Sequence, residues 1–350
     1  MAEEAALSGP FQLPSRYPTR PMTLSPIRPT AAAKPNRPVE SAAAEVAGAV
    51  SNWPFQLARA TAVATVLLIL FGGSVTTMGA GMAVDGWWDA EGHFLPFFPL
   101  DKWFRDLGTF VEHSHRQVGI LVGLLAIATV LATWRLDRRA SSNRWALAAL
   151  VAIVAQGTLG GVRVLENSED YAFIHGAFAQ AVFALLASTA RVLSPRWETL
   201  RSRTGLPARR LVTGVAIMVY IQVVLGCWYR HGLRPMPIGD LRLRLYVHVG
   251  LAVVVLCTLL WLGRRLSGAG LVREGRRLMI LVLVQVGLGL GAWGHWEPEA
   301  VGLTEGTLTV LHVLGGALLL AEIVGLALRT APAGESPDAD GGAPATETVT

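Results

Sequence analysis

Four histidines lie within apolar segments of this chain and recur at regular intervals. His115 and His175 are 60 residues apart, and His248 and His312 are 64 residues apart. Each stands near the beginning of a long apolar run, where an ionisable side chain is costly and indicates a function. Imidazole is a common axial ligand of heme iron, and facing helices can hold such a group in a bundle core. The pattern predicts two bis-histidine heme sites, His115 with His175 and His248 with His312.

Two other interpretations of these histidines are available. Zinc favours three or four protein ligands, and neither histidine pair has clustered cysteine or acidic residues beside it. A proton relay is the second alternative, because ionisable groups inside membrane helices can carry protons. A single buried histidine is more commonly a hydrogen-bonded packing residue. The heme interpretation therefore depends on four histidines at matched positions.

The two pairs differ in the residues that surround their first histidine. Glu112 precedes His115 by three residues and Arg116 follows it, whereas the segment before His248 reads Leu245-Tyr-Val. Positions three apart share a helix face, so Glu112 and His115 are expected side by side. A carboxylate there could accept a proton during redox chemistry on a substrate. The alternative is an acid at a helix start, paired with Arg116. The first site is therefore expected to be reactive, and the second to hold a permanent heme.

Arginines near both sites could bind the two propionates of heme, because arginine pairs with carboxylates through two hydrogen bonds. Four flank the second site: Arg230, Arg234, Arg242 and Arg244. Arg116 and Arg163 could have the same role in the first. Solvated loop charge is the alternative for all of them. We expect Arg230 and Arg244 to bind the heme of the second site, and Arg116 and Arg163 that of the first.

The elements that position these residues are membrane spans. Apolar side chains make up 52% of the 350 residues and charged ones only 16%, against about 25% charged in soluble proteins. Eight apolar segments approach the roughly 20 residues that a helix needs to cross a bilayer. They cover about residues 57–80, 113–134, 145–162, 173–193, 211–229, 245–263, 278–294 and 306–328. A soluble enzyme is excluded, and the expected fold is an all-α membrane protein.

The distribution of arginine predicts the orientation of these helices. The connections 135–144, 191–210 and 264–277 hold fifteen Arg, and the connections on the other side hold seven Lys or Arg. The positive-inside rule places the first set and both termini in the cytoplasm, and the histidines toward the outer side. The net charge of +5 therefore reflects topology, and no nucleic-acid partner is expected.

The chain is expected to form two similar halves between polar tails. Gln156, Gln222 and Gln285 each begin a Gln-x-x-Leu-Gly pattern near the end of a span. Together with the histidine spacing, this indicates a duplicated four-helix unit. We expect two pseudo-symmetric four-helix bundles, residues 56–195 with the first heme site and 196–329 with the second. Residues 1–55, rich in proline, and 330–350 are expected to be a disordered cytoplasmic arm and tail.

Six motifs in order resemble the heme A synthase family. They are Gly72-Gly-Ser-Val-Thr-Thr-Met-Gly-Ala-Gly-Met82, Glu112-x-x-His115-Arg116-x-x-Gly119, Gln156-Gly-x-Leu-Gly-Gly-x-Arg163, His175-Gly-x-x-Ala-Gln180, Leu225-Gly-x-x-x-Arg230-His-Gly232 and His312-x-x-x-Gly-Ala317. The resemblance covers about residues 57–328. It implies an eight-helix membrane oxidoreductase that oxidises the C8 methyl of heme O to a formyl group by successive hydroxylations. It also implies that His248 and His312 ligate a heme b cofactor, that His115 and His175 bind the substrate heme O, and that Glu112 is the catalytic carboxylate.

The resemblance further implies a role in terminal oxidase maturation in the bacterial plasma membrane. The expected partners are heme O, heme O synthase, terminal oxidase assembly factors, membrane lipid, an electron acceptor of unknown identity and a second copy of the chain. Many bacterial members carry cysteine pairs in outer loops, whereas here Cys227 stands alone and Cys257 lies deeper in a span. A loop disulfide or thiol relay is therefore not expected.

The alternative function is a di-heme b membrane protein that transfers electrons without substrate chemistry. A transporter or assembly scaffold is a third class, and it would be colourless. The first outer loop, 81–111, is rich in aromatic residues. It is expected to lie on the membrane interface or to cover the first site.

Overall fold

The computed structural model describes residues 52–137, 139–201, 209–231, 238–295 and 301–329. The predicted tail, almost all of the predicted arm, and Arg234 lie outside the described residues.

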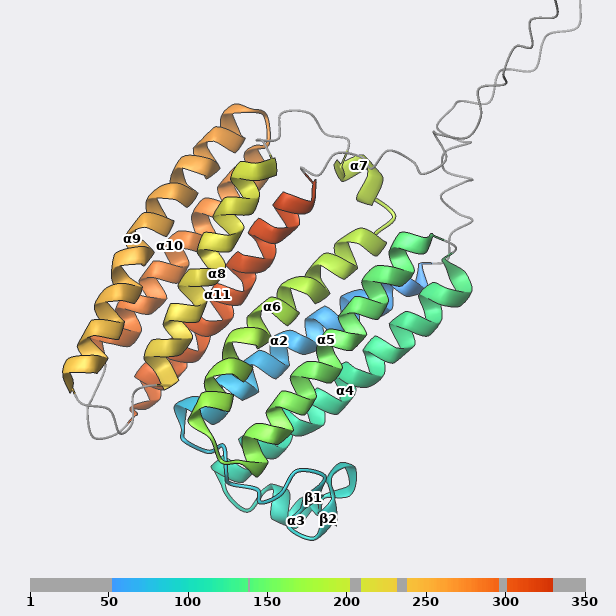
Figure 1. The fold of residues 1–350 in the computed structure, drawn as a ribbon, viewed down its shortest axis with the longest axis vertical. Coiled ribbons are helices and arrows are strands. Elements are labelled where there is room, and N and C mark those ends of the chain that lie inside the picture. Colours follow the sequence, from blue (N-terminus) through green and yellow to red (C-terminus); the bar gives the residue numbers. More distant parts are fainter. Residues whose placement is uncertain (1–51, 138, 202–208, 232–237, 296–300, 330–350) are drawn as a thin grey trace, which may run out of the picture. The chain divides into compact units, whose positions relative to one another are not determined.

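Eight long helices correspond to the eight predicted apolar segments (Figure 1). All are long and apolar enough to cross a membrane, so the prediction of an all-α integral membrane protein is confirmed. The helices are α2 (Trp53–Thr77), α4 (Leu107–Leu136), α5 (Ala140–Leu165), α6 (Glu169–Leu193), α8 (Arg209–His231), α9 (Ile238–Gly268), α10 (Val272–Gly294) and α11 (Leu303–Arg329).

All eight of these helices begin before the corresponding apolar segment does, and a polar side chain caps two of them, α4 and α6. Asp106 accepts a hydrogen bond from the Thr109 amide at the start of α4. Ser168 accepts one from the Tyr171 amide at the start of α6. Such side chains satisfy amides that have no partner within the helix. An apolar run therefore marks the membrane-crossing part of each helix and not its full length.

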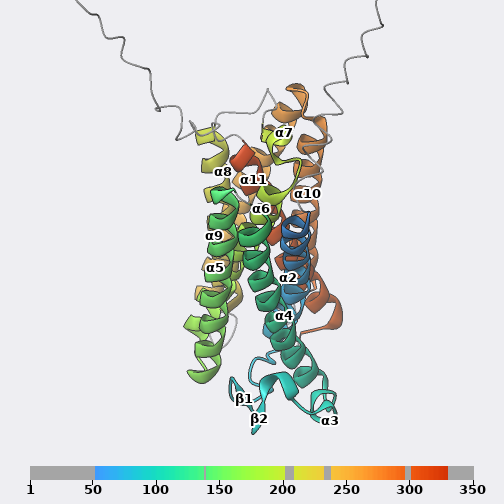
Figure 2. The ribbon, with the colours of Figure 1, turned by 90° about the vertical axis from the view of Figure 1, so that its right-hand side faces the viewer.

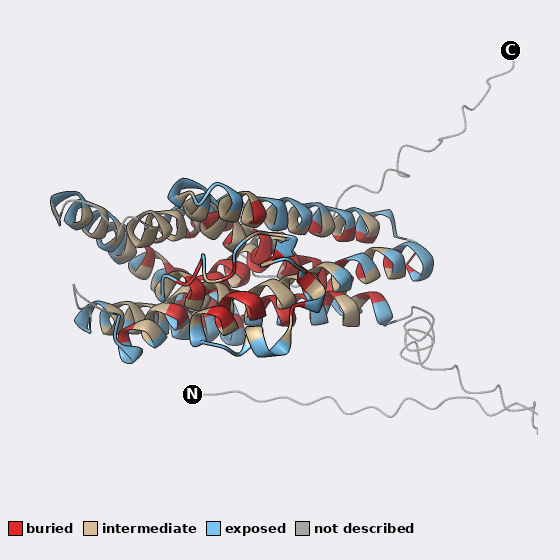
Figure 3. Ribbon diagram, turned by 90° about the horizontal axis from the view of Figure 1, so that it is seen from below, coloured by how far each residue is buried: buried red, intermediate tan, exposed pale blue. Residues whose placement is uncertain are grey.

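The long helices contact one another in two rings. In the first, α2, α4, α5 and α6 follow one another and α6 returns to α2; in the second, α8, α9, α10 and α11 close in the same way. Helices α2 and α6 contact α11, and α6 also contacts α8. The largest cluster of buried apolar side chains spans this junction and includes Phe183, Leu259 and Ile323. Figure 3 shows buried residues between the helices and exposed ones on their outer faces, where lipid is the solvent.

Consecutive spans run in opposite directions, so α4, α6, α9 and α11 all begin at one end of the bundle. We call this the histidine end, because each of these helices carries one of the four histidines in its first half. A short helix, α7 (Trp197–Arg201), follows α6 at the opposite end.

The segment between α2 and α4 folds into a small compact loop (Figure 2). It contains the strands β1 (Asp89–Ala90) and β2 (His93–Phe94), the 3-10 turn η1 (Leu95–Phe97) and the helix α3 (Leu100–Trp103). The strands pair antiparallel, with Ala90 opposite His93. The two residues between them, Glu91 and Gly92, have φ values of 50° and 79°. A two-residue hairpin turn favours positive φ at both positions.

Candidate functional site

Each of the four predicted heme-ligating histidines lies against a glycine of the preceding long helix. A methyl group at any of these glycines would lie 2.7 to 3.0 Å from Cε1 of the histidine, a distance that leaves no room for a side chain. Only glycine lets the two helices pack this closely. The pairs are Gly72 with His115, Gly160 with His175, Gly226 with His248, and Gly289 with His312.

Glutamine side chains connect three of the histidines to the same neighbouring helix. The Nε2 atoms of Gln156, Gln222 and Gln285 donate to the main-chain carbonyls of His175, His248 and His312, at 3.0, 3.0 and 2.9 Å. Each glutamine precedes the contacting glycine by four residues, which is about one helical turn. Leu68 has the corresponding position before Gly72. These glutamines and glycines are absent from the predicted site, although the spacing Gln-x-x-x-Gly recurs and could have identified them.

Main-chain carbonyls determine which nitrogen carries the proton in two of the imidazoles. The Leu68 carbonyl lies 3.1 Å from Nδ1 of His115, and the Gln285 carbonyl lies 3.0 Å from Nδ1 of His312. A carbonyl only accepts hydrogen bonds, so the proton is on Nδ1 and the lone pair is on Nε2. Metal-ligating histidines commonly have this arrangement.

The second histidine pair is spaced for one metal ion between the two rings. The ring centres of His248 and His312 are 6.3 Å apart, with an interplanar angle of 78°. Two metal–imidazole bonds of about 2 Å each place the ring centres about 6 Å apart. The residues of this site therefore fit a bis-histidine heme.

No group of three or more His, Cys, Asp or Glu side chains arranged for a metal ion occurs among the residues that the structure describes. Zinc therefore has no supporting ligand set in this part of the chain. Cys227 is a half-buried free thiol on α8, and Cys257 is an exposed free thiol on α9. The two cysteines form no disulfide.

Arg163 and Arg230 are half-buried cations bound to neutral groups. Nη2 of Arg230 donates to the Gly73 carbonyl and to Oγ1 of Thr77, both at 2.6 Å. Nη1 of Arg163 donates to the Gly81 carbonyl. Neither arginine has a carboxylate partner among the described residues, so both charges remain available to an anion.

Arg163 and Arg230 also lie about one helical turn from the glycines that contact His175 and His248. Arg163 follows the glycine that contacts His175 by three residues, and Arg230 follows the glycine that contacts His248 by four. Arg244, the other arginine predicted for the second site, donates to the Trp228 carbonyl at 2.8 Å and lies 4.6 Å from that indole ring. The fit to heme propionates is therefore best for Arg163 and Arg230.

Glu112 is buried, and both of its carboxylate oxygens accept hydrogen bonds. Oε1 accepts from Nη2 of Arg116 at 2.6 Å, and Oε2 accepts from the Val84 amide at 2.8 Å. Arg116 also donates to the carbonyls of Val84 and Gly86, at 2.8 and 2.7 Å. The pair therefore fastens the loop to α4. The positive charge of Arg116, unlike that of Arg163, is balanced by a carboxylate, that of Glu112.

The loop between α2 and α4 packs on the first ring of helices, at the histidine end. Trp87 lies against Gly161 of α5. His113 is fully buried, with its ring centre 4.4 Å from Phe98 and 4.7 Å from Trp103. Nε2 of His113 lies 2.8 Å from the Gln117 amide. His113 thus belongs to the contact between the loop and α4.

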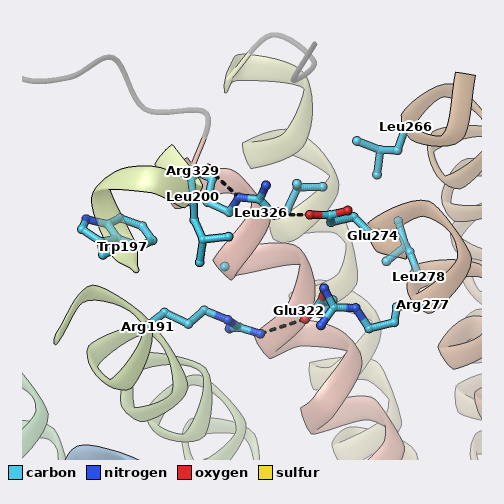
Figure 4. Close-up of a pocket in the computed structure, with 11 residues that line it drawn as sticks. Arg191, Trp197, Leu200, Leu266, Glu274, Arg277, Leu278, Glu322, Leu326 and Arg329 are labelled. Carbon is cyan, nitrogen blue, oxygen red and sulfur yellow. Dashed lines mark hydrogen bonds and ion pairs between the residues drawn. The ribbon is translucent and has the colours of Figure 1, made fainter. Parts of the chain in front are cut away.

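A cavity of about 150 Å³ lies at the end of the bundle opposite the histidines (Figure 4). Two ion pairs line it: Arg191 with Glu322 at 2.8 Å, and Arg329 with Glu274 at 3.1 Å. Arg191 belongs to α6 of the first ring, and its partner belongs to α11 of the second. This cluster connects the two rings and has no part in the histidine sites.

Comparison with known proteins places the chain in a family. The COX15-CtaA family, described as cytochrome oxidase assembly protein, matches residues 56–238. The heme A synthase of Symbiobacterium thermophilum is 30% identical over 254 residues, which are 64% of this chain and 80% of that protein. Those of Shouchella clausii and Exiguobacterium sibiricum are 25% and 28% identical, and the alignments span 57% and 55% of their lengths. The resemblance given by the six motifs is confirmed. Because the match extends over more than half of its residues, the chain belongs to the COX15-CtaA family of cytochrome oxidase assembly proteins.

Proposed function

We propose that this protein is a heme A synthase, which oxidises the C8 methyl of heme O to a formyl group by successive hydroxylations. The observation that carries the proposal is the set of four histidines, each held against a glycine of the neighbouring helix. Relatives named heme A synthase support it. In this proposal His248 and His312 hold a heme b cofactor, and His115 and His175 hold heme O. The heme groups supply the redox chemistry when bound, while the protein orients them and excludes water.

The residues of the chain have separate tasks in this reaction. Arg230 binds a propionate at the second site and Arg163 binds one at the first, because their charges have no carboxylate partner among the described residues. Arg244 and Arg116 contribute positive charge at the second and first sites. The loop, fastened by Glu112 and Arg116, keeps bulk water from the first site.

Glu112 is the proposed catalytic carboxylate, three residues from His115 on the same helix face. Its role is to accept a proton at Oε1 or Oε2 during oxidation of the methyl group. Arg116 and the Val84 amide hold the carboxylate in position. Neither His248 nor His312 has a carboxylate three residues before it in the sequence, which supports the assignment of the first site as the substrate site.

We further propose that the protein lies in a bacterial plasma membrane with both termini in the cytoplasm and the histidine end toward the outer side. Heme O synthase would supply the substrate, and terminal oxidase assembly factors would receive the product. A separate acceptor must remove the electrons that the oxidation releases. A homo-oligomer is compatible with each of these roles.

Paired substitutions distinguish the two roles of Glu112. Glu112→Gln removes the carboxylate, whereas Arg116→Gln keeps the carboxylate and weakens the attachment of the loop by removing the bonds of Arg116 to the carbonyls of Val84 and Gly86. We expect Glu112→Gln to abolish heme A formation with both hemes still bound, and Arg116→Gln to retain partial activity. Equal activity in the two variants would show that Glu112 only fastens the loop. Full activity of Glu112→Gln would remove its catalytic role, and bound hemes with no heme A in the unmodified protein would favour the di-heme electron carrier.

A further inference from the structure

The loop between α2 and α4 presents two different faces. One face is buried against the first ring: Leu95 and Phe98 are almost fully buried, and Phe98 stacks on His113. Trp103 donates from Nε1 to Oγ of Ser114 at 3.1 Å. The loop is therefore held in place, and the position of its opposite face is fixed as well.

The opposite face carries a row of large apolar side chains, which we call the loop stripe. Its members are 59% to 80% exposed, which is unusual for side chains of this size outside a membrane span. The ring centres of Phe94 and Phe97 are 6.0 Å apart, and Leu100 and Phe104 are four residues apart at α3, so each of these two pairs shares a side of the loop. The loop stripe consists of Phe94, Phe97, Leu100, Phe104 and Leu107.

The loop stripe continues into the surface of the membrane spans. Leu107 is the first residue of α4. The ring centre of Phe104 lies 5.4 Å from that of Phe110 on α4, which in turn lies 6.3 Å from that of Phe71 on α2. Phe110 and Phe71 are both partly exposed. A series of aromatic contacts therefore leads from the loop stripe to α4 and α2.

The charged side chains of the loop are typical of the boundary between lipid and water. Arg105 pairs with Glu91 at 2.6 Å, and Lys102 lies 3.7 Å from the same carboxylate. Aromatic side chains mixed with long basic ones are typical of the boundary between lipid and water. Exposed acidic residues, Asp85 and Asp89, lie in the part of the loop that precedes the loop stripe.

We propose that the loop stripe inserts into the lipid leaflet at the histidine end, and that lipid is its partner. Helical or turned segments with one apolar face bind membranes in this manner. The other face of the same loop contacts Glu112 through Val84. Insertion therefore holds the loop against the first ring. This inference rests on exposure and aromatic contacts alone and does not depend on the proposed enzymatic activity.

Nitroxide labels on the full chain test this proposal. Cys227 and Cys257 are replaced by Ala, and single cysteines are introduced as Phe97→Cys and Phe104→Cys. Asp85→Cys is the matched control, because it is an exposed position of the same loop outside the loop stripe and outside the β1–β2 pairing. Power-saturation EPR in liposomes of phosphatidylethanolamine and phosphatidylglycerol compares accessibility to oxygen, which concentrates in lipid, with accessibility to a water-soluble nickel chelate.

We expect labels at 97 and 104 to be several-fold more accessible to oxygen than to nickel, and the label at 85 to show the reverse. Nickel accessibility at 97 equal to that at 85 would place the loop stripe in water and overturn the proposal. Protection from both reagents would show that a protein surface, such as a second copy, covers the loop stripe, and would also overturn it. If Phe97→Cys fails to fold by circular dichroism, Leu100→Cys takes its place.

Discussion

His312 and Gln285 contact each other at three points, of which the longest, 3.3 Å, lies between their Nε2 atoms. Nδ1 of His312 lies 3.0 Å from the Gln285 main-chain carbonyl, and the Gln285 side-chain amide donates to the His312 carbonyl at 2.9 Å. The first bond directs the lone pair of the imidazole to Nε2, and the second fixes the helix that carries it. One residue thus sets both the chemical state and the position of a proposed heme ligand.

The glycine contacts predict a sharp difference between two neighbouring positions of α10. Gly289→Ala would place a methyl group 2.8 Å from Cε1 of His312, whereas a methyl group at Gly287 would have no neighbour within 4 Å. Overpacking of this kind costs about 1–3 kcal/mol, so heme affinity at the second site should fall roughly tenfold or more. Gly287→Ala should leave it unchanged. Heme titration of both purified variants measures this, and equal affinities would contradict the role of the contact.

Arg230 should have opposite effects on heme binding and on the stability of the heme-free protein. Its half-buried charge has only Gly73 and Thr77 as hydrogen-bond partners among the described residues. Arg230→Leu should therefore weaken heme binding, because a propionate loses its partner. The thermal stability of the heme-free protein should stay constant or rise, because an uncompensated charge is removed. A fall in heme-free stability together with unchanged heme affinity would show that Arg230 only joins α8 to α2.

The ion pair at the end opposite the histidines should be sensitive to loss of one partner. Glu274 and Arg329 are both buried. Glu274→Gln leaves the Arg329 charge without its carboxylate and should destabilise the protein by about 3 kcal/mol. Arg277→Gln is the control: its side chain is 60% exposed and 3.6 Å from Glu322, so the change should cost at most about 1 kcal/mol. Thermal unfolding of both variants in the same detergent measures their stability. A similar loss of stability in Glu274→Gln and Arg277→Gln would argue against a buried ion pair.

The loop contains a carboxylate whose contribution should depend on pH. A hydrogen bond and positive charge from Arg105, with smaller help from Lys102, hold the pKa of Glu91 below its ordinary value of 4.5, against the opposing effect of burial. A lowered folded-state pKa stabilises the protein above pH 4.5, and this stabilisation is lost as the pH falls through the folded-state value.

Glu91→Gln should therefore lower the unfolding temperature at pH 7. The difference in unfolding temperature between Glu91→Gln and the unmodified protein should disappear below pH 4.5. Asp106 also has a lowered pKa, owing to its bonds to Thr109, so the comparison must be made between proteins that keep Asp106. Asp89→Asn, at an exposed position of the same hairpin, should show no such difference. A difference in unfolding temperature that stays constant from pH 7 to pH 3 would contradict the ionic role of Glu91.

The membrane-spanning architecture could be predicted from the sequence because apolar runs of about 20 residues have one main structural solution. The loop fold could not, because its hairpin and its burial of His113 depend on contacts with α4 and α5. The site was predicted in part. Histidines stand out in apolar segments, whereas Gln156, Gln222 and Gln285 resemble ordinary packing residues until the helices are placed side by side. The hydrogen bond that Glu112 accepts from the Val84 amide likewise joins residues that are distant in sequence.

The most direct test of the central claim is heme extraction, with chromatography and mass spectrometry, after co-expression of the protein with a heme O synthase. Expression of the synthase alone is the control, and a known heme A synthase in the same host shows that the host supports the reaction. We predict heme A, or its hydroxymethyl intermediate, only when this protein is present. A purified red protein that carries only heme b and heme O, in a host where the known enzyme works, would contradict the assigned synthase activity.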